Sequence, residues 1–263
     1  MNRIIIYPYK MSSQSSKKLA QALRGVGHQV LRVYPDRNYR PRPSDTIINW
    51  GNSTQPSWND SYILNTTSAI KVSCNKQSSF LRFYRDLVPT LKCTDNKSVA
   101  EQWVSEGNKV FCRTLLTGHS GRGIIVATTP EELVDAPLYT QEFKKTREYR
   151  IHVWDENVLD FQEKRRRSEA GSRYDVDVWN HGNDFVYARE NVELPECVKN
   201  AAIQAIESVG LIFGAVDIGY NHRDNTCAVF EVNSAPGLYG TTLNKYVEKI
   251  DGLVFNNPNP REF

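Results

Sequence analysis

The chain has 263 residues, of which 40% are hydrophobic and 11% aromatic, so it can build one large domain or two to three small ones and is not disordered by composition. A net charge of +3 gives no global signal for nucleic-acid binding, because the basic residues form local runs at 37–42, 144–150 and 164–167. Five cysteines without a CxxC pair favour a reduced, cytoplasmic protein over a disulfide framework or a zinc site. The N-terminus predicts a strand rather than a signal peptide, and no apolar run approaches the roughly 20 residues of a membrane span.

The first 72 residues are expected to form a small α/β unit. Apolar runs and glycine stops predict a strand at 4–6, a helix at 15–24, and strands at 29–33 and 46–49. Strands that alternate with a helix favour a parallel sheet, in which ligands bind beyond the carboxyl ends of the strands. The loops 7–9 and 49–52 are therefore candidate substrate-side loops, with ordinary turns as the alternative.

The middle of the chain alternates between short helices and strands. The pattern predicts helices at 75–86 and 98–106, strands at 110–116, 123–127 and 138–143, and a hairpin of 148–154 with 158–165. A glycine-rich segment, 117–123, joins two of these strands, and glycines let backbone N–H groups approach a phosphate closely. Gly118, Ser120, Gly121 and Gly123 are therefore candidate phosphate contacts. The segment is neither a P-loop nor a dinucleotide fingerprint, because a strand follows it; a plain hairpin turn is the alternative.

Several basic residues are candidates for binding or catalysis. Arg113 sits inside an apolar strand and needs an anionic partner, such as a nucleotide phosphate. Lys76, at the start of its helix, is a second candidate, with a surface lysine as the alternative. Arg150 and Lys164 fall on adjacent strands of the predicted hairpin and are expected to face one cleft, and Arg166 in the same basic run is a further catalytic candidate.

A candidate nucleotide-binding group lies beside these cations. Gln141, Glu142 and Phe143 end a strand and run into a basic segment. Backbone groups of such a linker can recognise a nucleobase, while carboxylates accept from its amino group and from the ribose hydroxyls. Glu148 is the second carboxylate nearby.

The C-terminal third carries the clearest pattern. An amphipathic helix at 195–209 precedes two apolar runs that predict a hairpin and carry Asp217 on one strand, and Glu231 and Asn233 on the other. Strands alternate faces, so the three oxygen-bearing side chains share a face and suit Mg²⁺. The alternative is the solvated side of an ordinary hairpin, but carboxylates inside apolar runs are costly unless paired or liganded. A last helix is expected at 241–250.

Taken together, residues 70–250 resemble the ATP-grasp superfamily, specifically RimK-type carboxylate–amine ligases, and are similar to small phage-encoded members. Asp217, Glu231 and Asn233 look like the family's magnesium ligands, and Pro236 with Gly237 completes its E-x-N-x-x-P-G signature. This signature with an upstream aspartate is specific, whereas the glycine-rich loop alone is not.

The nucleotide side follows the same order along the chain. Lys76 looks like the first nucleotide lysine, 117–123 like the loop over the phosphates, 141–143 like the adenine hinge, and Glu148 like the ribose carboxylate. Arg113 departs from the family, which normally has a lysine followed by a proline there. Arginine keeps the charge and binds phosphate in a bidentate manner, so ATP binding is expected to survive with altered geometry.

The resemblance implies an α+β ATP-grasp fold of two subdomains that grip ATP, preceded by an α/β parallel-sheet domain. The expected units are 1–72, then 73–140 with the glycine-rich loop, then 141–263 with the metal site. It also implies ATP and two Mg²⁺ ions, with Mn²⁺ as a substitute, and an acyl-phosphate intermediate whose transferring oxygens are stabilised by Arg150, Lys164 and Arg166. A kinase acting on a hydroxyl and a non-catalytic nucleotide-binding protein remain alternatives.

The substrates are less defined than the chemistry. The basic runs are expected to attract an acidic acceptor, with an amino acid or a peptide ranked above a modified nucleic acid. A membrane partner is not expected, and the expected location is the cytoplasm, as for a phage protein that acts inside its host. The sequence leaves the carboxylate, the amine and the oligomeric state open.

Overall fold

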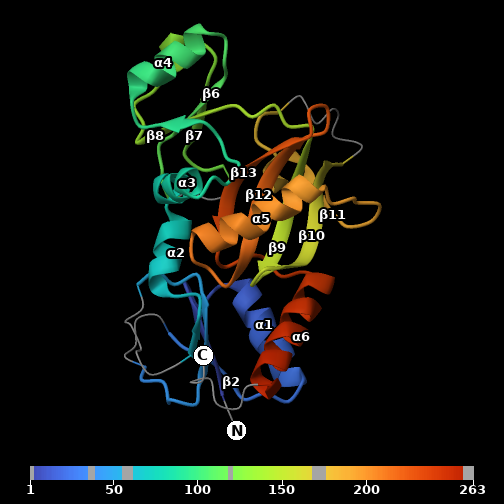
Figure 1. Ribbon diagram of the computed structural model, residues 1–263. Coiled ribbons are helices and arrows are strands. Elements are labelled where there is room, and N and C mark those ends of the chain that lie inside the picture. Colours follow the sequence, from blue (N-terminus) through green and yellow to red (C-terminus); the bar gives the residue numbers. More distant parts are fainter. Residues whose placement is uncertain (1–2, 35–38, 55–61, 118–120, 168–175, 257–263) are drawn as a thin grey trace.

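The structure is a computed structural model that describes residues 3–34, 39–54, 62–117, 121–167 and 176–256. These ranges form three β-sheets, which follow one another from the bottom to the top of Figure 1: an N-terminal sheet, a five-stranded central sheet and a smaller four-stranded sheet. Within the same ranges, no helix combines the length and the apolar character needed to cross a membrane.

The N-terminal sheet is parallel, as predicted. Its strand order is β2-β1-β3-β4, from β1 (Ile4–Pro8), β2 (Val30–Arg32), β3 (Thr46–Trp50) and β4 (Tyr62–Leu64). The β1 and β3 strands are entirely buried, which explains their unbroken apolar runs. The short β4 strand was not predicted, because three residues carry too little periodicity to distinguish a strand from a turn.

Two long helices pack beside this sheet. They are α1 (Gln14–Gly25) and α6 (Thr241–Asn256), which lie side by side at the lower right of Figure 1. Ser13 caps α1 by accepting a hydrogen bond from the backbone N–H of Ser16. The His28 side chain following α1 contacts Asp251 of α6 at 2.6 Å. The C-terminal helix therefore returns to the N-terminal unit and ties the two ends of the chain together.

A pair of short helices connects the N-terminal unit to the rest. They are α2 (Thr67–Cys74) and α3 (Lys76–Arg85), separated by Asn75, whose side chain caps α3 by accepting from the backbone N–H of Ser78 at 3.0 Å. The α3 helix was predicted and α2 was not. Thr66 caps α2, but its eight residues show only a weak apolar stripe. The α2 helix runs across the expected division between residues 72 and 73.

The upper sheet has the order β5-β8-β6-β7 and is antiparallel. Its strands are β5 (Cys93–Thr94), β6 (Val110–Arg113), β7 (Ile124–Ala127) and β8 (Leu138–Gln141), with α4 (Lys97–Ser105) and the 3₁₀ turn η1 (Pro130–Glu132) packed against them. The β6 strand ends at Arg113, three residues before the predicted end at 116. The glycine-rich segment joins β6 to β7, as expected.

The central sheet is antiparallel with the order β11-β10-β9-β12-β13. Its strands are β9 (Arg147–Trp154), β10 (Asn157–Arg166), β11 (Phe185–Ala188), β12 (Phe213–Asn221) and β13 (Thr226–Asn233); α5 (Glu196–Ser208) covers one face, and the 3₁₀ turn η4 (His181–Asn183) precedes β11. Tyr149, Ile151 and Val153 point into the core beneath α5. Because side chains alternate, Glu148 and Arg150 face the opposite side, where the site lies.

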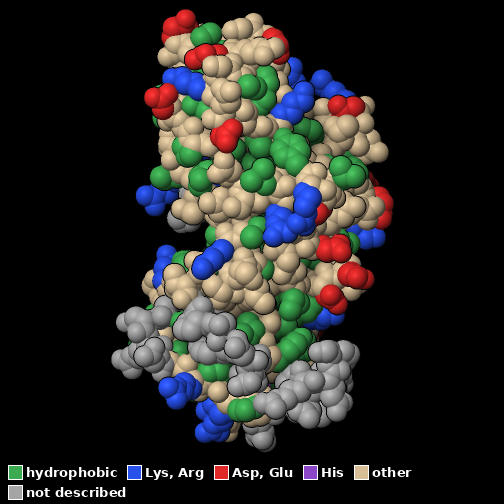
Figure 2. Space-filling view, turned by 60° about the vertical axis from the view of Figure 1, so that its left-hand side comes forward, with side chains coloured by type: hydrophobic (Ala, Val, Ile, Leu, Met, Phe, Trp, Pro, Cys, Tyr) green, Lys and Arg blue, Asp and Glu red, His purple; other side chains and the backbone are tan. Residues whose placement is uncertain are grey.

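Charge is distributed unevenly over the molecule. In the view of Figure 2, the charged side chains coloured at the lower end, where the N-terminal unit lies, are Lys and Arg, whereas Asp and Glu are coloured higher up. Residues 1–66 contain nine Lys and Arg against three Asp, while the rest of the chain contains 24 basic and 27 acidic residues. The N-terminal unit is therefore basic and the remainder slightly acidic.

Candidate active site

A cavity of about 1240 Å³ lies between the upper and central sheets and extends toward the loop after β13. It brings together residues predicted separately from distant parts of the sequence. The predicted site residues that line it are Arg113, Gly121, Gln141, Glu142, Phe143, Glu148, Arg150, Lys164, Asp217, Glu231 and Asn233. Its volume exceeds that of an ordinary small-molecule site, which leaves room for a nucleotide and a second substrate.

The three oxygen-bearing side chains of the C-terminal hairpin share one face, as predicted. Asp217 pairs with Glu231, and Ala215 pairs with Asn233, across the β12–β13 ladder. The Asn233 Nδ2 atom is buried without a hydrogen-bond partner. No group of three or more His, Cys, Asp or Glu side chains suited to a metal was found in the described ranges. The hairpin offers two carboxylates, Asp217 and Glu231, and the amide of Asn233, so it contains only two side chains of those four types.

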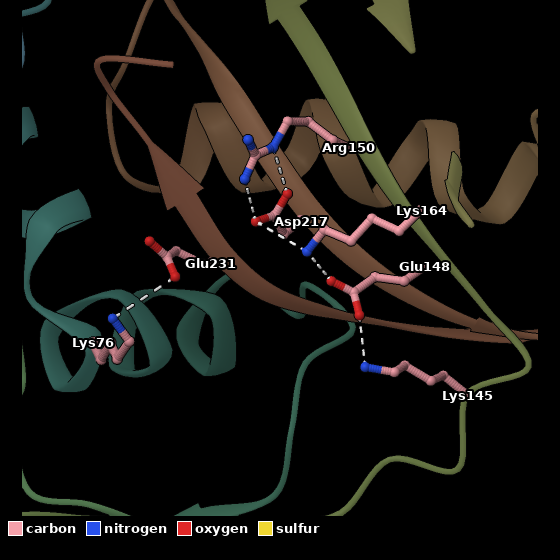
Figure 3. A network of polar contacts seen from close by, with 7 residues as sticks. All are labelled: Lys76, Lys145, Glu148, Arg150, Lys164, Asp217 and Glu231. Carbon is pink, nitrogen blue, oxygen red and sulfur yellow. Dashed lines mark hydrogen bonds and ion pairs between the residues drawn. The ribbon is translucent and has the colours of Figure 1, made fainter. Parts of the chain in front are cut away.

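Asp217 is held by cations from two neighbouring strands (Figure 3). Arg150 on β9 donates to both of its carboxylate oxygens, and Lys164 on β10 has its Nζ 3.8 Å away. Burial by itself would raise the pKa of Asp217, but Arg150 and Lys164 outweigh burial and lower it to about 2. The same contacts raise the pKa of Arg150 and Lys164 against the effect of burial. The carboxylate and both cations are therefore fully charged.

Glu148 extends this network toward the upper sheet. Lys164 and Lys145 each donate to one of its carboxylate oxygens, the latter at 2.6 Å. Glu148 is only 4% exposed, and burial would raise its pKa, but the two lysines lower it overall. The result is a buried row of alternating charges that runs from Lys145 to Arg150. Such a row holds each side chain in one orientation, because moving one of them away would leave the neighbouring charge buried without its partner.

Glu231 is less well compensated than Asp217. Its nearest cation is Lys76 at the start of α3, with 3.8 Å between Nζ and Oε2. Burial raises the pKa of Glu231, and Lys76 only partly opposes this effect. Burial also lowers the pKa of Lys76. The pKa of Glu231 therefore stays raised by burial, although Lys76, Arg150 and Arg113 all act to lower it.

Arg113 is buried at the end of β6, with 8% exposure. Its Nε donates to Thr140 Oγ1 at 3.2 Å, and its guanidinium lies 5.8 Å from the Phe80 ring centre. Burial lowers its pKa to about 10, and no ion pair to it occurs within the described part of the chain. Arg113 lines the cavity, and the carboxylate of Glu231 attracts it only from beyond ion-pair distance, so this buried cation is poised for an anionic ligand.

The opposite wall of the cavity is aromatic. Phe143 packs edge-to-face on Phe230, with 6.3 Å between ring centres, and Trp179 stacks on Phe185 at 5.0 Å. Lys145 Nζ lies 4.5 Å from the Trp179 ring centre. Lys109 of the upper sheet forms an ion pair with Asp177, which closes this side of the cavity. Flat rings and a nearby carboxylate are what a nucleobase and its amino group require.

Of the other predicted residues, Lys76, Gly123 and Arg166 do not line the cavity. Gly121 and Gly123 have positive φ values of 80° and 73°. Gly121 lines the cavity, whereas Gly123 faces Leu115, whose Cγ would lie 2.8 Å from an added Cβ. Gly118 and Ser120 lie outside the described residues. Arg166, at the end of β10, does not line the cavity and pairs with Phe185 in the β10–β11 ladder.

Several residues that line the cavity were not predicted from the sequence. Tyr187 on the unpredicted strand β11 lies under the Arg150 guanidinium, 4.6 Å from its ring centre. Lys145 was visible only as part of a basic run, and Trp179 and Tyr239 stood in segments without periodicity. An aromatic residue in the alternating stretch Phe185–Ala188 was the only local signal for Tyr187.

The chain is similar in fold to several proteins of known structure. No protein-family model and no curated protein matches the chain. Among solved structures, the ATP-grasp ligase PsnB, bound to Mg, ADP and a phosphomimetic precursor variant, has a TM-score of 0.71 at 11% identity, over 98% of this chain and 99% of its own. D-alanyl-alanine synthetase A from Vibrio cholerae has a TM-score of 0.68 at 14% identity over 98% of each chain. The chain has the fold of the ATP-grasp ligases.

A third neighbour adds a peptide complex. The RiPP-associated ATP-grasp ligase from Chryseobacterium gregarium, solved with ADP and a leader and core peptide, has a TM-score of 0.68 at 15% identity over 97% of each chain. The ATP-grasp fold expected from the sequence is thus confirmed over nearly the whole chain, including the N-terminal sheet. At these identities the likeness establishes the fold, and the roles of individual residues rest on the geometry of the cavity.

Proposed function

We propose that this chain is an ATP-dependent carboxylate–amine ligase of the RimK type. In the proposed reaction, ATP phosphorylates a carboxylate to give an acyl phosphate and ADP, and an amine then displaces phosphate to form an amide. The observation that supports this most strongly is the cavity itself, in which Glu231 and Asn233 lie with the cations Arg113 and Arg150 between two sheets of an ATP-grasp fold, while Lys76 approaches Glu231 from the start of α3. The three units 1–72, 73–140 and 141–263 are part of the proposal.

Asp217, Glu231 and Asn233 suit Mg²⁺ as ligands, with two ions expected and Mn²⁺ as a substitute. All three offer oxygen atoms. Burial raises the pKa of Glu231, a cost that a bound cation would offset, and the Asn233 Nδ2 has no hydrogen bond to lose if the amide turns its oxygen toward a cation. Bound Mg²⁺ would supply neutralisation of the nucleotide phosphates.

The nucleotide is assigned to the half of the cavity beneath the upper sheet. Gln141, Glu142 and Phe143 would hold the base, and Lys76 and Arg113 would hold the phosphates together with the backbone of the glycine-rich loop. Glu148 has a lysine on each oxygen, yet each oxygen keeps a further lone pair for a ribose hydroxyl. In these assignments the base lies against the aromatic wall of the cavity, and the phosphates lie near its cations.

The reacting carboxylate is assigned to the end near Arg150 and Lys164. A cation there offsets the charge that develops on the phosphoryl and acyl oxygens, and its effect is large because Tyr187 covers Arg150 on one side. Arg166 is given no contact with the reacting atoms in this proposal, because it does not line the cavity. The second substrate is an amino acid or a peptide, since two ligases of similar fold were solved with peptides. We also propose the cytoplasm, where ATP is supplied, as the place of the reaction.

The test is ADP release from ATP and Mg²⁺ over panels of amino acids, polyamines and acidic peptides, with mass spectrometry of the product. Added hydroxylamine should trap the acyl phosphate as a hydroxamate. An amide product with equal amounts of ADP and phosphate supports the ligase. A phosphorylated product without free phosphate would indicate a kinase, and nucleotide binding without turnover on any panel would indicate a non-catalytic protein.

A pair of variants separates the site from general effects. Glu231→Gln keeps the size of the side chain and removes its charge, so turnover should fall at least about 100-fold while the fold persists. Glu156→Gln changes an exposed glutamate in the β9–β10 turn and should leave turnover unchanged. Full turnover by Glu231→Gln would contradict the proposed site.

A further inference from the structure

Three exposed lysines gather at one edge of the basic N-terminal unit. Lys10 follows the carboxyl end of β1, and Lys17 and Lys18 lie in the first two turns of α1. No ion pair holds any of them within the described residues. The first turn of α1 has no acidic side chain, and lysines near a helix N-terminus are opposed by the helix dipole. This edge therefore concentrates positive charge that the described protein does not neutralise.

Tyrosine rings contact two of these lysines. Lys18 Nζ is 4.3 Å from the ring centre of Tyr239, and Lys10 Nζ is 5.1 Å from that of Tyr9. The side chains of Tyr9 and Tyr239 are 46% and 63% exposed, so both rings are accessible to a ligand. Tyr239 also lines the cavity, so the lysine-bearing edge borders the cavity through the contact of Lys18 with Tyr239.

Contacts with neighbouring segments hold this edge in place. Arg32 donates from Nη2 to Met11 O at 2.7 Å and to Ser16 Oγ at 3.0 Å, which fixes the loop between β1 and α1. On the other side, Gly51 lies so close to Ala235 that a Cβ added to it would be 2.7 Å from the alanine Cβ. The surface is therefore formed before a ligand arrives, and its ligand need not organise it.

We propose that Lys10, Lys17 and Lys18, together with Tyr9 and Tyr239, form a docking surface for the acidic flank of an extended peptide. This proposal rests on the proposed function and names its substrate class: a peptide whose reactive carboxyl reaches Arg150 while neighbouring acidic side chains contact the lysines. Tyrosine rings supply apolar contact for the chain between these points at small entropic cost. The surface is an addition to the nucleotide and metal site rather than part of it.

The charge pattern favours a peptide over a nucleic acid. Three lysines can neutralise only a few charges, and the chain beyond residue 66 has a net charge of −3, counting 24 Lys and Arg against 27 Asp and Glu. A long polyanion would extend past the lysines onto this acidic remainder and be repelled. A short acidic segment would not. A peptide also brings the carboxyl group that the proposed reaction requires.

The test is direct binding of fluorescein-labelled hexaglutamate at low salt, measured by fluorescence anisotropy, with hexaglutamine and a single-stranded oligonucleotide of about 30 nucleotides, long enough to extend past the lysines, as comparison probes. We expect hexaglutamate to bind at least about tenfold more tightly than either. The triple variant Lys10→Gln/Lys17→Gln/Lys18→Gln should lose about tenfold in hexaglutamate affinity and show a weaker salt dependence. The matched control Lys71→Gln/Lys92→Gln/Lys249→Gln removes three exposed lysines elsewhere and should retain more than half of the affinity.

Three results would overturn the docking surface: equal binding of hexaglutamate and hexaglutamine, equal losses in both triple variants, or tighter binding of the oligonucleotide. ADP binding, measured in parallel, reports whether the triple variant is folded. The binding assay needs no turnover, so a failed ligase function appears separately, as peptide binding without ADP formation. Failure of the docking surface alone appears as ADP formation with peptides regardless of their charge.

Discussion

The guanidinium of Arg150 donates two parallel hydrogen bonds to the carboxylate of Asp217, from Nε at 2.8 Å and from Nη2 at 2.7 Å. A bidentate pair of this kind is among the stronger contacts a protein can make. It occupies both oxygens of a side chain that is proposed to bind Mg²⁺. Arg150 and a metal ion therefore compete for Asp217, and binding of one should loosen the other.

Arg150→Met should destabilise the metal-free protein and make it more responsive to Mg²⁺. Removing one partner of a buried pair costs about 3 kcal/mol, which lowers Tm by roughly 6–12 °C in a chain of this size. With its oxygens released, Asp217 should bind Mg²⁺ about tenfold more tightly in calorimetry without nucleotide. Arg82→Met, on the exposed side of α3, should change neither quantity. Unchanged Mg²⁺ affinity in Arg150→Met would argue against the competition.

His152 should make the protein sensitive to mild acid. It is fully buried beside Tyr246, and burial, reinforced by Arg150, lowers its pKa to about 3. Because this pKa lies below the ordinary value of about 6.5, the stabilisation is complete above pH 6.5 and is lost as pH falls toward 3. We expect a loss of up to about 1.4 kcal/mol per pH unit relative to His152→Gln in urea denaturation. His222→Gln, which removes a partly exposed histidine, should keep the wild-type slope.

Alanine substitutions at two glycines with positive φ should distinguish the cost of backbone strain from the cost of close packing. Gly27 has φ of 97° and open space around it, whereas Gly51 has φ of 79° and faces Ala235. Gly27→Ala should cost about 1 kcal/mol through the backbone alone. Gly51→Ala should cost a further 1–3 kcal/mol, roughly, because the added methyl pushes the N-terminal unit away from the loop after β13. It should also raise KM for the carboxylate substrate more than KM for ATP. Equal stability of the two variants in denaturant titrations would refute this.

The arginine at position 113 should substitute for a lysine in nucleotide binding. Arg113→Lys keeps a positive charge in the buried position and should bind a non-hydrolysable ATP analogue within about tenfold of the wild type. Arg113→Met removes the charge and should lose about 100-fold, as expected for a charged hydrogen bond to phosphate. Isothermal calorimetry measures both, with Arg82→Met as the control. Comparable affinities in the methionine and wild-type proteins would remove Arg113 from the phosphate site.

Trp179 should report nucleotide binding. Its ring stacks on Phe185, lies 4.5 Å from Lys145 Nζ, and lines the proposed base pocket. ADP should therefore change the intrinsic fluorescence, and Trp179→Phe should remove at least about half of that change while retaining binding. Trp103→Phe, on α4 away from the cavity, should preserve the change. A signal that persists in Trp179→Phe would place the nucleotide elsewhere.

Local patterns in the sequence were enough for the main elements and for the face that carries the candidate metal ligands. Alternation along two strands places Asp217, Glu231 and Asn233 on one side of a hairpin, and the ladder between β12 and β13 confirms this arrangement. The parallel N-terminal sheet and the antiparallel hairpins were also predictable from short apolar runs. The elements missed, α2, β4 and β11, are short and carry little periodicity.

The partners of the charges were decided only by tertiary structure. Asp217 lies opposite Arg150 because β12 pairs with β9 in one register, and Lys164 reaches Glu148 because β10 pairs with β9 in another. Likewise, Lys18 meets Tyr239 because α1 packs against the loop after β13. Periodicity and residue type can be read from residues close together in the chain, so the sequence alone predicted which types of side chain the candidate site contains. Which opposite charges meet depends on the packing of strands far apart in the chain, and only the folded core sets that register.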